Sequence, residues 1–382
     1  MGARRRLLLA ALVVCAGISL LSLGYARDNA AAAGPLPGRL ADQEFWALSD
    51  GFSEPNGYFR SDNLVSNEHT YQYVVPALER AVRPGGVYLG VAPDQNFTYI
   101  AATRPQMAFI VDIRRGNLLQ HLMYKALFEL SDDRAGFVSR LFSKPRPDGL
   151  SAEATVTELF TAFAQVRRDD ALFRENVGAI QRHLTEARGF DLSAGDLRDL
   201  ESIFFAFYRD GPGIRYSTGS RAFGGRGNRG FPTFEELTMQ TDWEGRSRSY
   251  LASEADYGFL RGLQERNLIV PVVGDFAGPK ALRSVGQFIR DHGSTVSAFY
   301  VSNVEQYLFQ DGQWDAFAEN LATLPLDSRS TFIRSVSTRY GYAGSYTWRD
   351  GRASALDPIQ DLVDAFRRRE IQSYFDVNAR SR

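Results

Sequence analysis

Residues 86–113, GVYLGVAPDQNFTYIAATRPQMAFIVDI, decide the fold of this chain. Apolar runs at 87–92 and 108–113 predict two buried strands, and residues 97–102 between them predict a short helix. A unit of strand, polar turn, helix and strand holds a nucleotide-type ligand at the edge of a parallel sheet, where the turn supplies N–H groups and an acid binds ribose hydroxyls. Gly90 and Asp112 are about twenty residues apart, which suits these two roles.

The strand pattern resumes late in the chain. Residues 268–275 and 295–302 predict two further buried strands, and 331–337 is a plausible fifth. The sequence therefore predicts an α/β fold with a doubly wound, mostly parallel sheet. Right-handed crossovers would place the 90–96 turn beside residues 302–307, where a ligand crevice would lie.

The interval between the second and third predicted strands has helical periodicity, which predicts a large helical insertion over residues 131–266. Residues 40–130 and 267–382 would then form the two halves of the sheet domain. Helices are predicted at 40–48, 68–81, 117–130, 152–167, 170–184, 194–210, 279–292, 314–324 and 357–374, with two more pieces within 234–265.

The composition excludes several classes of function. The net charge is −1 over 382 residues, so the chain has no global basic field to bind nucleic acid. A single cysteine, Cys15, excludes a disulfide within the chain and a cysteine zinc site. The histidines lack metal-ligand spacing, and no Walker A, GxGxxG or GxSxG motif is present. A small molecule is therefore the expected partner.

The N-terminus carries a targeting signal. Arg4-Arg5-Arg6 precede an apolar run at residues 7–23, and small residues follow. This pattern is typical of a signal peptide over residues 1–26, and the run is also just long enough to anchor the chain in the inner membrane. Residues 27–39 would form a flexible linker. We expect an exported body, periplasmic or secreted, that meets the membrane only through this segment, and cleavage or anchoring remains open.

Four short motifs carry a family resemblance: FSEPNGYF at 52–59, SNE at 66–68, GVAPDQNFTYIA at 90–101 and VSNVEQYL at 301–308. With the predicted fold, they make the chain similar to class I S-adenosylmethionine-dependent methyltransferases. More narrowly, the chain resembles an uncharacterised bacterial family with that fold. The resemblance implies S-adenosylmethionine as cofactor, although a fold does not by itself imply a function.

The resemblance also implies a set of cofactor-binding residues. The turn after the first strand would hold the amino-acid end of the cofactor, Asp112 the ribose and Asp275 the adenine, while Ser302 would face the substrate. The whole set is Gly90, Ala92, Pro93, Asp94, Gln95, Asn96, Asp112, Asp275 and Ser302. One departure is that proline follows Ala92, because proline lacks the N–H donor that a glycine-rich turn supplies. The alternative is a vestigial fold in which Asp112 caps a helix.

The candidate catalytic residues are polar groups near the predicted edge of the sheet: Glu54, Tyr58, Glu68, Asn303 and Glu305. An acid among them could deprotonate a methyl acceptor if it faces the ligand. The alternative for residues 54–69 is structural, with Asn56 and Gly57 shaping a turn and Asn67 and Glu68 capping a helix.

Three functions remain open at this point. The first is an S-adenosylmethionine-dependent transferase of unknown substrate. The second is a non-enzymatic exported domain that binds another small molecule, or an acidic group of a partner, in the same crevice. The third is an interaction module that uses the Gly/Arg-rich residues 211–234, for which a surface loop is the simpler interpretation and a lid over the site the alternative. Export opposes the first function, because the cofactor is made in the cytoplasm.

Overall fold

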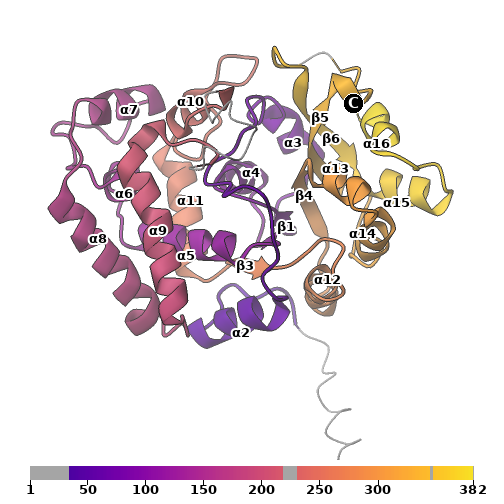
Figure 1. Cartoon of the computed structure of the whole chain (residues 1–382), viewed down its shortest axis with the longest axis horizontal. Helices are drawn as coiled ribbons and strands as arrows, with labels where there is room; N and C mark the ends of the chain where they lie inside the picture. The colour runs from indigo at the N-terminus through magenta and orange to yellow at the C-terminus, as the bar shows by residue number, and fades with distance from the viewer. Residues whose placement is uncertain (1–33, 218–229, 345–346, 382) are drawn as a thin grey trace, which may run out of the picture.

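The computed structural model describes residues 34–217, 230–344 and 347–381. A six-stranded sheet runs through the centre of the molecule in the order β3-β2-β1-β4-β5-β6 (Figure 1). The first five strands are parallel and β6 runs antiparallel to β5. The strands are β1 (Val87–Gly90), β2 (Met107–Asp112), β3 (Ile269–Val273), β4 (Val296–Ser302), β5 (Thr331–Ser337) and β6 (Arg352–Pro358).

The first four strands are buried along nearly their whole length, as expected for parallel strands covered on both faces. The structure confirms the α/β class and the mostly parallel sheet, and each predicted strand is present within two residues of its expected ends. Chain order reverses at β1, which pairs with β2 on one side and with β4 on the other. The carboxyl ends of β1 and β4 therefore lie side by side.

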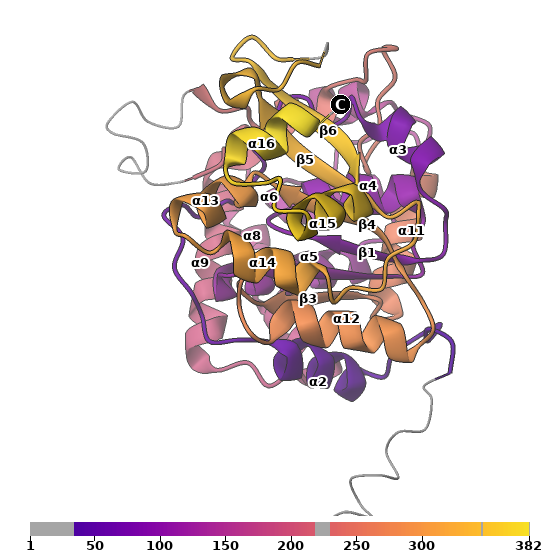
Figure 2. The ribbon, with the colours of Figure 1, turned by 90° about the vertical axis from the view of Figure 1, so that its right-hand side faces the viewer.

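Helices cover both faces of the sheet (Figures 1 and 2). One layer contains α2 (Asp42–Phe52), α12 (Ala281–Asp291), α14 (Trp314–Leu321) and α15 (Ile359–Arg367). The other contains α4 (Gln95–Thr103), α5 (Arg115–Glu129) and α11 (Glu254–Glu265), with α3 (Val75–Ala81) packed against α4. Two short helices, α13 (Val304–Gln310) and α16 (Tyr374–Arg380), contact each other beside β4.

Helices also fill the interval between β2 and β3. After α5 come α6 (Arg134–Phe142), α7 (Val156–Ala164), α8 (Asp170–Arg182), the π-helix η1 (His183–Ala187), α9 (Ala194–Asp210), the 3-10 turn η2 (Gly211–Gly213) and α10 (Phe234–Met239). Their apolar side chains join those of the sheet in one continuous core. The insertion thus packs against the sheet domain rather than forming a core of its own.

Two predicted helices are shorter in the structure than expected. The helix expected over 68–81 begins only at Val75, because the preceding side chains bond to distant parts of the chain: Gln72 Nε2 donates to the Leu237 carbonyl (2.9 Å). The helix expected over 357–374 is present as α15, which ends at Arg367, and a separate helix, α16, begins at Tyr374. β6 was not predicted, and its pairing with β5 over seven residues takes up the first two residues of the expected helix.

Within the part of the chain that the structure describes, no helix has the length and apolarity needed to cross a bilayer. The signal or anchor predicted at residues 1–26 lies outside the described residues, as do residues 218–229 of the predicted loop.

Candidate functional site

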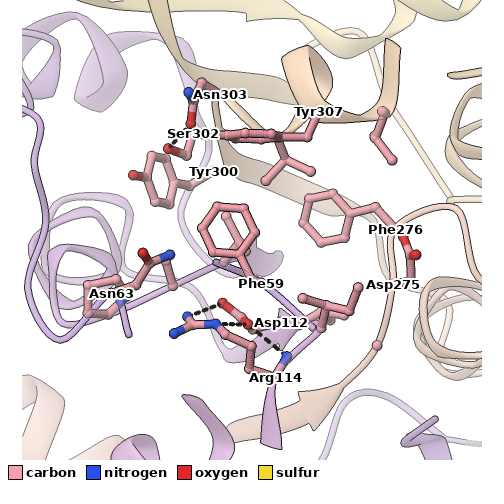
Figure 3. A pocket seen from close by; sticks show the side chains of 18 of the residues that line it. Phe59, Asn63, Asp112, Arg114, Asp275, Phe276, Tyr300, Ser302, Asn303 and Tyr307 are labelled. Atoms are coloured by element: carbon pink, nitrogen blue, oxygen red, sulfur yellow. Dashed lines mark hydrogen bonds and ion pairs between the residues drawn. The ribbon is translucent and has the colours of Figure 1, made fainter. Parts of the chain in front are cut away.

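A cavity of about 160 Å³ opens at the carboxyl edge of the sheet (Figure 3). The carboxyl ends of β2 and β4 and the residues after β1 and β3 all contribute to its wall, through residues that include Ala92, Asp112, Asp275 and Ser302. As the sequence predicts, the turn after β1 and the residues after β4 meet here. Ligands of open parallel sheets bind at this point of reversed strand order.

The segment formed by residues 53–67 crosses the carboxyl edge of the sheet and contributes to the cavity wall. Backbone N–H groups fix the segment to two strand ends: Glu54 donates to Val273 (2.8 Å) and Gly57 donates to Ile113 (2.8 Å). Gly57 is required for this approach, because a Cβ there would lie 2.3 Å from the Ile113 side chain. Asn56 Oδ1 accepts the Arg115 N–H (2.7 Å) at the start of α5. The turn predicted at Asn56 and Gly57 is not observed, because residues 53–59 are irregular and these two residues instead bond to Arg115 and Ile113.

Aromatic rings make up much of the cavity wall. Phe59 projects into the cavity (Figure 3) and meets the Tyr307 ring edge to face, with centroids 5.2 Å apart. Phe276, Tyr300 and Tyr216 add further ring surface. The predicted catalytic Tyr58 lies at the mouth, where it is 84% exposed. Such walls suit a flat, largely apolar ligand group.

Asp112, the predicted ribose ligand, lies in the wall but is already engaged by Arg114. Its Oδ1 accepts from the Arg114 backbone N–H and from Nε (2.9 Å each), and its Oδ2 accepts from Nη2 (2.8 Å) (Figure 3). Each carboxylate oxygen has two lone-pair sites. One site on Oδ2 is therefore left to accept a hydrogen bond from a ligand hydroxyl.

The turn after β1 is built around Asn96. Asn96 Nδ2 donates to the carbonyls of Val91 (2.8 Å), Ala92 (3.2 Å) and Pro93 (2.7 Å). The Ala92 carbonyl also lies 2.9 Å from His121 Nε2, and burial lowers the pKa of His121 to about 4, so the neutral ring donates. Ala92 has φ +65°, a left-handed conformation that glycine adopts more readily. Asn96 is thus a positioning residue behind the wall.

Four residues predicted to bind the cofactor lie behind the cavity wall instead of lining it: Gly90, Asp94, Gln95 and Asn96. Gly90 is glycine for a packing reason, because a Cβ there would lie 1.9 Å from Asn96 Oδ1. Burial raises the pKa of Asp94 to about 7. For these four residues the structure corrects the sequence interpretation, whereas Ala92, Pro93, Asp112, Asp275 and Ser302 do line the cavity.

Glu68 lies one layer behind the cavity and connects to it through two hydroxyls. Its Oε1 accepts from Ser302 Oγ (2.6 Å) and from the Tyr300 hydroxyl (2.8 Å), and its Oε2 accepts from Gln95 Nε2 (3.0 Å). Burial raises the pKa of Glu68. Ser302 and Tyr300 both line the cavity, so a proton could pass between the cavity and Glu68 through the Ser302 hydroxyl.

Ser302 is held in an unusual conformation, with φ +52° at the point where β4 leads into α13. A non-glycine residue in this region costs about 1–3 kcal/mol, and such residues cluster at functional sites. The next residue, Asn303, also lines the cavity, as the sequence predicts. Two left-handed residues, Ala92 and Ser302, therefore flank the gap between β1 and β4.

Glu54 and Glu305, both predicted to be catalytic, are not brought to the cavity. The Glu54 carboxylate accepts backbone N–H groups of Asp275 (3.0 Å), Lys280 (2.8 Å) and Ala281 (2.9 Å), which fixes the loop into α12. Glu305 is buried against Arg334, whose Nη2 donates to its Oε1 (3.0 Å). Both acids have structural partners, so neither is placed to take a proton from a ligand in this cavity.

The sequence interpretation missed several residues of the wall. Tyr300 was predictable from the sequence, because it lies two positions before Ser302 on the same strand and therefore shares its face of the sheet. Phe59, Asn63 and Tyr216 reach the wall from loops, and their positions depend on long-range contacts such as the Leu64 N–H bonded to the Tyr216 carbonyl (2.9 Å). Among the described residues, no three His, Cys, Asp or Glu side chains are grouped to hold a metal ion.

Fold and site together define an α/β protein with a cavity at the carboxyl edge of a mostly parallel sheet. A family model described as "Domain of unknown function (DUF7790)" matches residues 63–190 and 231–370, and the chain belongs to that family. The two matched ranges include every sheet strand. No curated protein matches the chain.

Proposed function

We propose that the chain is a methyltransferase-like protein that binds S-adenosylmethionine, or a related nucleoside, in the cavity at the carboxyl edge. The cavity itself carries the proposal, because the ends of four parallel strands meet in it. The sheet order also supports a Rossmann-like fold, in which ligands bind where the order reverses. The resemblance of the motifs to class I methyltransferases adds the choice of cofactor.

The size and lining of the cavity fit part of such a ligand. An apolar protein cavity of about 150 Å³ accommodates a benzene molecule, so this open cavity of about 160 Å³ has room for one ring of the adenine. In this proposal the adenine lies against the aromatic side chains of the wall, near Asp275 and Phe276. The ribose reaches the open lone pair of Asp112, and the amino-acid end extends past Ala92 and Pro93 toward solvent.

The cofactor supplies an electrophilic methyl group, and the protein's task is to position an acceptor and, where needed, remove its proton. Ser302 is the residue best placed to do this, because its hydroxyl lies in the wall and donates to Glu68. The hydroxyl accepts the acceptor's proton as it passes its own to the carboxylate. The raised pKa of Glu68 makes that carboxyl a stronger base than an exposed one.

A second candidate is a non-catalytic exported domain that binds a different small molecule in the same cavity. The three hydrogen bonds from Arg114 to the Asp112 carboxylate favour this second candidate, because only one lone pair, on Oδ2, remains to accept from a ribose hydroxyl. Pro93 favours it too, since the turn offers one N–H donor fewer. Export, which the N-terminal pattern predicts, would also separate the body from the cytoplasmic cofactor.

Calorimetric titration of the purified chain with S-adenosylmethionine tests the proposal. We expect saturable binding that weakens at least tenfold, about 1.4 kcal/mol, in Asp112→Asn, which keeps the side-chain shape. The matched control is Asp361→Asn, an exposed acid on α15. No saturable binding up to about 1 mM, a free energy of about −4 kcal/mol, would overturn the proposal and leave the second candidate. A topology reporter fused after residue 45 determines the compartment.

A further inference from the structure

A second cavity, of about 320 Å³, adjoins the first. It lies beyond the carboxyl end of β5, and its wall includes the 3-10 turn η4 (Thr338–Tyr340) and the start of β6. Asn303, Tyr307, Asn67 and Tyr216 line both cavities, so a single layer of side chains separates them. A ligand in one cavity is therefore close to a ligand in the other.

The second cavity differs from the first in charge. Its lining residues include three arginines, Arg60, Arg339 and Arg352, and one acid, Asp350. Arg352 Nε lies 3.1 Å from Asp350 Oδ2, and both side chains are nearly half exposed, so this ion pair is weak. Positive charge thus exceeds negative charge in the wall, although the whole chain carries a net charge of −1.

Hydrogen bonds between neighbouring side chains hold the wall in place. Arg60 Nη2 donates to the Tyr307 hydroxyl (2.9 Å), and its guanidinium lies 5.2 Å from that ring's centroid. Gln306 Nε2 donates to the Tyr340 hydroxyl (3.2 Å), and the Arg339 guanidinium lies 5.8 Å from the Tyr340 centroid. Both distances are within the range at which a ring attracts a cation, so these contacts restrain the two side chains.

We propose that this second cavity binds the oxyanion, phosphate or carboxylate, of a small organic molecule. A guanidinium presents a planar fork of donors that matches both groups in a bidentate way, and Arg339 and Arg352 enter the cavity from two different elements. This site goes beyond the proposed function, because anion binding requires no nucleoside in the first cavity. If both sites are occupied together, the shared wall at Asn303 and Tyr307 is where the two ligands meet.

Titration calorimetry with three probes of similar size tests this inference: phenyl phosphate, benzoate and the neutral benzamide. We expect at least one of the two anions to bind saturably and benzamide to bind at least tenfold more weakly. The two anionic arms distinguish a phosphate site from a carboxylate site. Equal binding of all three probes, or no saturable binding of either anion up to about 10 mM, roughly −2.7 kcal/mol, would overturn it.

A pair of double variants separates this cavity from general surface charge. Arg339→Gln/Arg352→Gln should weaken anion binding at least tenfold. The control Arg182→Gln/Arg198→Gln removes the same charge from exposed positions on α8 and α9 and should change it less than twofold. Equal losses in both double variants would refute the site. Circular dichroism checks that each variant is folded, and the single Arg339→Gln variant replaces the double one if it is not.

The two proposals fail independently. If the wild-type chain does not bind S-adenosylmethionine, the anion titrations can still succeed, because the probes are used without cofactor. Failure of the anion titrations leaves the first cavity and its cofactor titration as they stand. A competition between S-adenosylmethionine and the anions would show whether ligands in the two cavities touch.

Discussion

Replacing Asp94 by asparagine should make the stability of the protein less sensitive to a rise in pH from about 4 to about 7. Asp94 is only 7% exposed, and burial, together with the nearby Asp94 carboxylate, raises the pKa values of Tyr71, Tyr124 and Tyr250. Burial raises the pKa of Asp94 itself from 3.8 to about 7. The folded state therefore holds this proton more tightly than the unfolded state, so ionisation destabilises the fold.

The size of the effect follows from the two pKa values. A difference of about three pH units, at about 1.4 kcal/mol per unit, is a cost of about 4 kcal/mol once the pH exceeds 7. Below pH 3.8 the carboxyl is protonated in both states and costs nothing. About 2 kcal/mol of the cost falls between about pH 5.5 and about pH 8.5, the range in which unfolding is easily measured.

Urea denaturation followed by tryptophan fluorescence gives the measurement. The free energy of unfolding of Asp94→Asn, minus that of the wild type, should increase by about 2 kcal/mol across that pH range. Asp361→Asn, an exposed substitution of the same kind, should show no such trend. Parallel curves for the wild type and Asp94→Asn would refute the reasoning, because they would mean that Asp94 keeps an ordinary pKa.

Four further substitutions, at three positions, test the packing around the site. Gly90→Ala would place a Cβ 1.9 Å from Asn96 Oδ1, and we expect a loss of about 3 kcal/mol in urea denaturation; a loss below about 1 kcal/mol would contradict the close approach. Ala92→Gly relieves a left-handed backbone at φ +65° and should raise the thermal midpoint slightly, while Ala92→Val should lower it; equal midpoints would count against strain there. Arg334→Met leaves the buried Glu305 without its partner and should lower the free energy of unfolding by about 3–5 kcal/mol near neutral pH. A much smaller loss would mean that the two side chains are not in contact.

Sequence reasoning recovers the sheet well because its strands are continuous apolar runs. LIVPVVGD and TVSAFYVS each contain one of the predicted strands, β3 and β4. β6, with the sequence RASALDP, lacks such a run, begins with an exposed arginine and ends in proline. Only its pairing with β5 makes it a strand, and that pairing is a long-range property that local patterns do not contain.

The site was harder to predict than the fold, because position after a strand does not determine where a side chain points. Gly90 has the position of a ligand-binding glycine, yet Asn96 fills the space next to it. Glu54 has the chemistry of a base, yet three backbone N–H groups occupy its oxygens. Glu68, predicted to be a catalytic acid or a helix cap, is a buried partner of Ser302 behind the cavity and caps no helix. Distances across the fold decided each of these cases.

The bond between Glu68 and Ser302 joins residues 234 positions apart in the chain, and Glu54 binds backbone groups more than 220 positions downstream. A nascent chain that has emerged only through the helical insertion possesses neither contact. Its β1 and β2 would present an unpaired edge until β4 arrives, and contacts between such distant residues form slowly. Ligand-binding capacity should therefore appear all at once, late in biosynthesis, and a polypeptide cut short before β4 should be inert and prone to self-association.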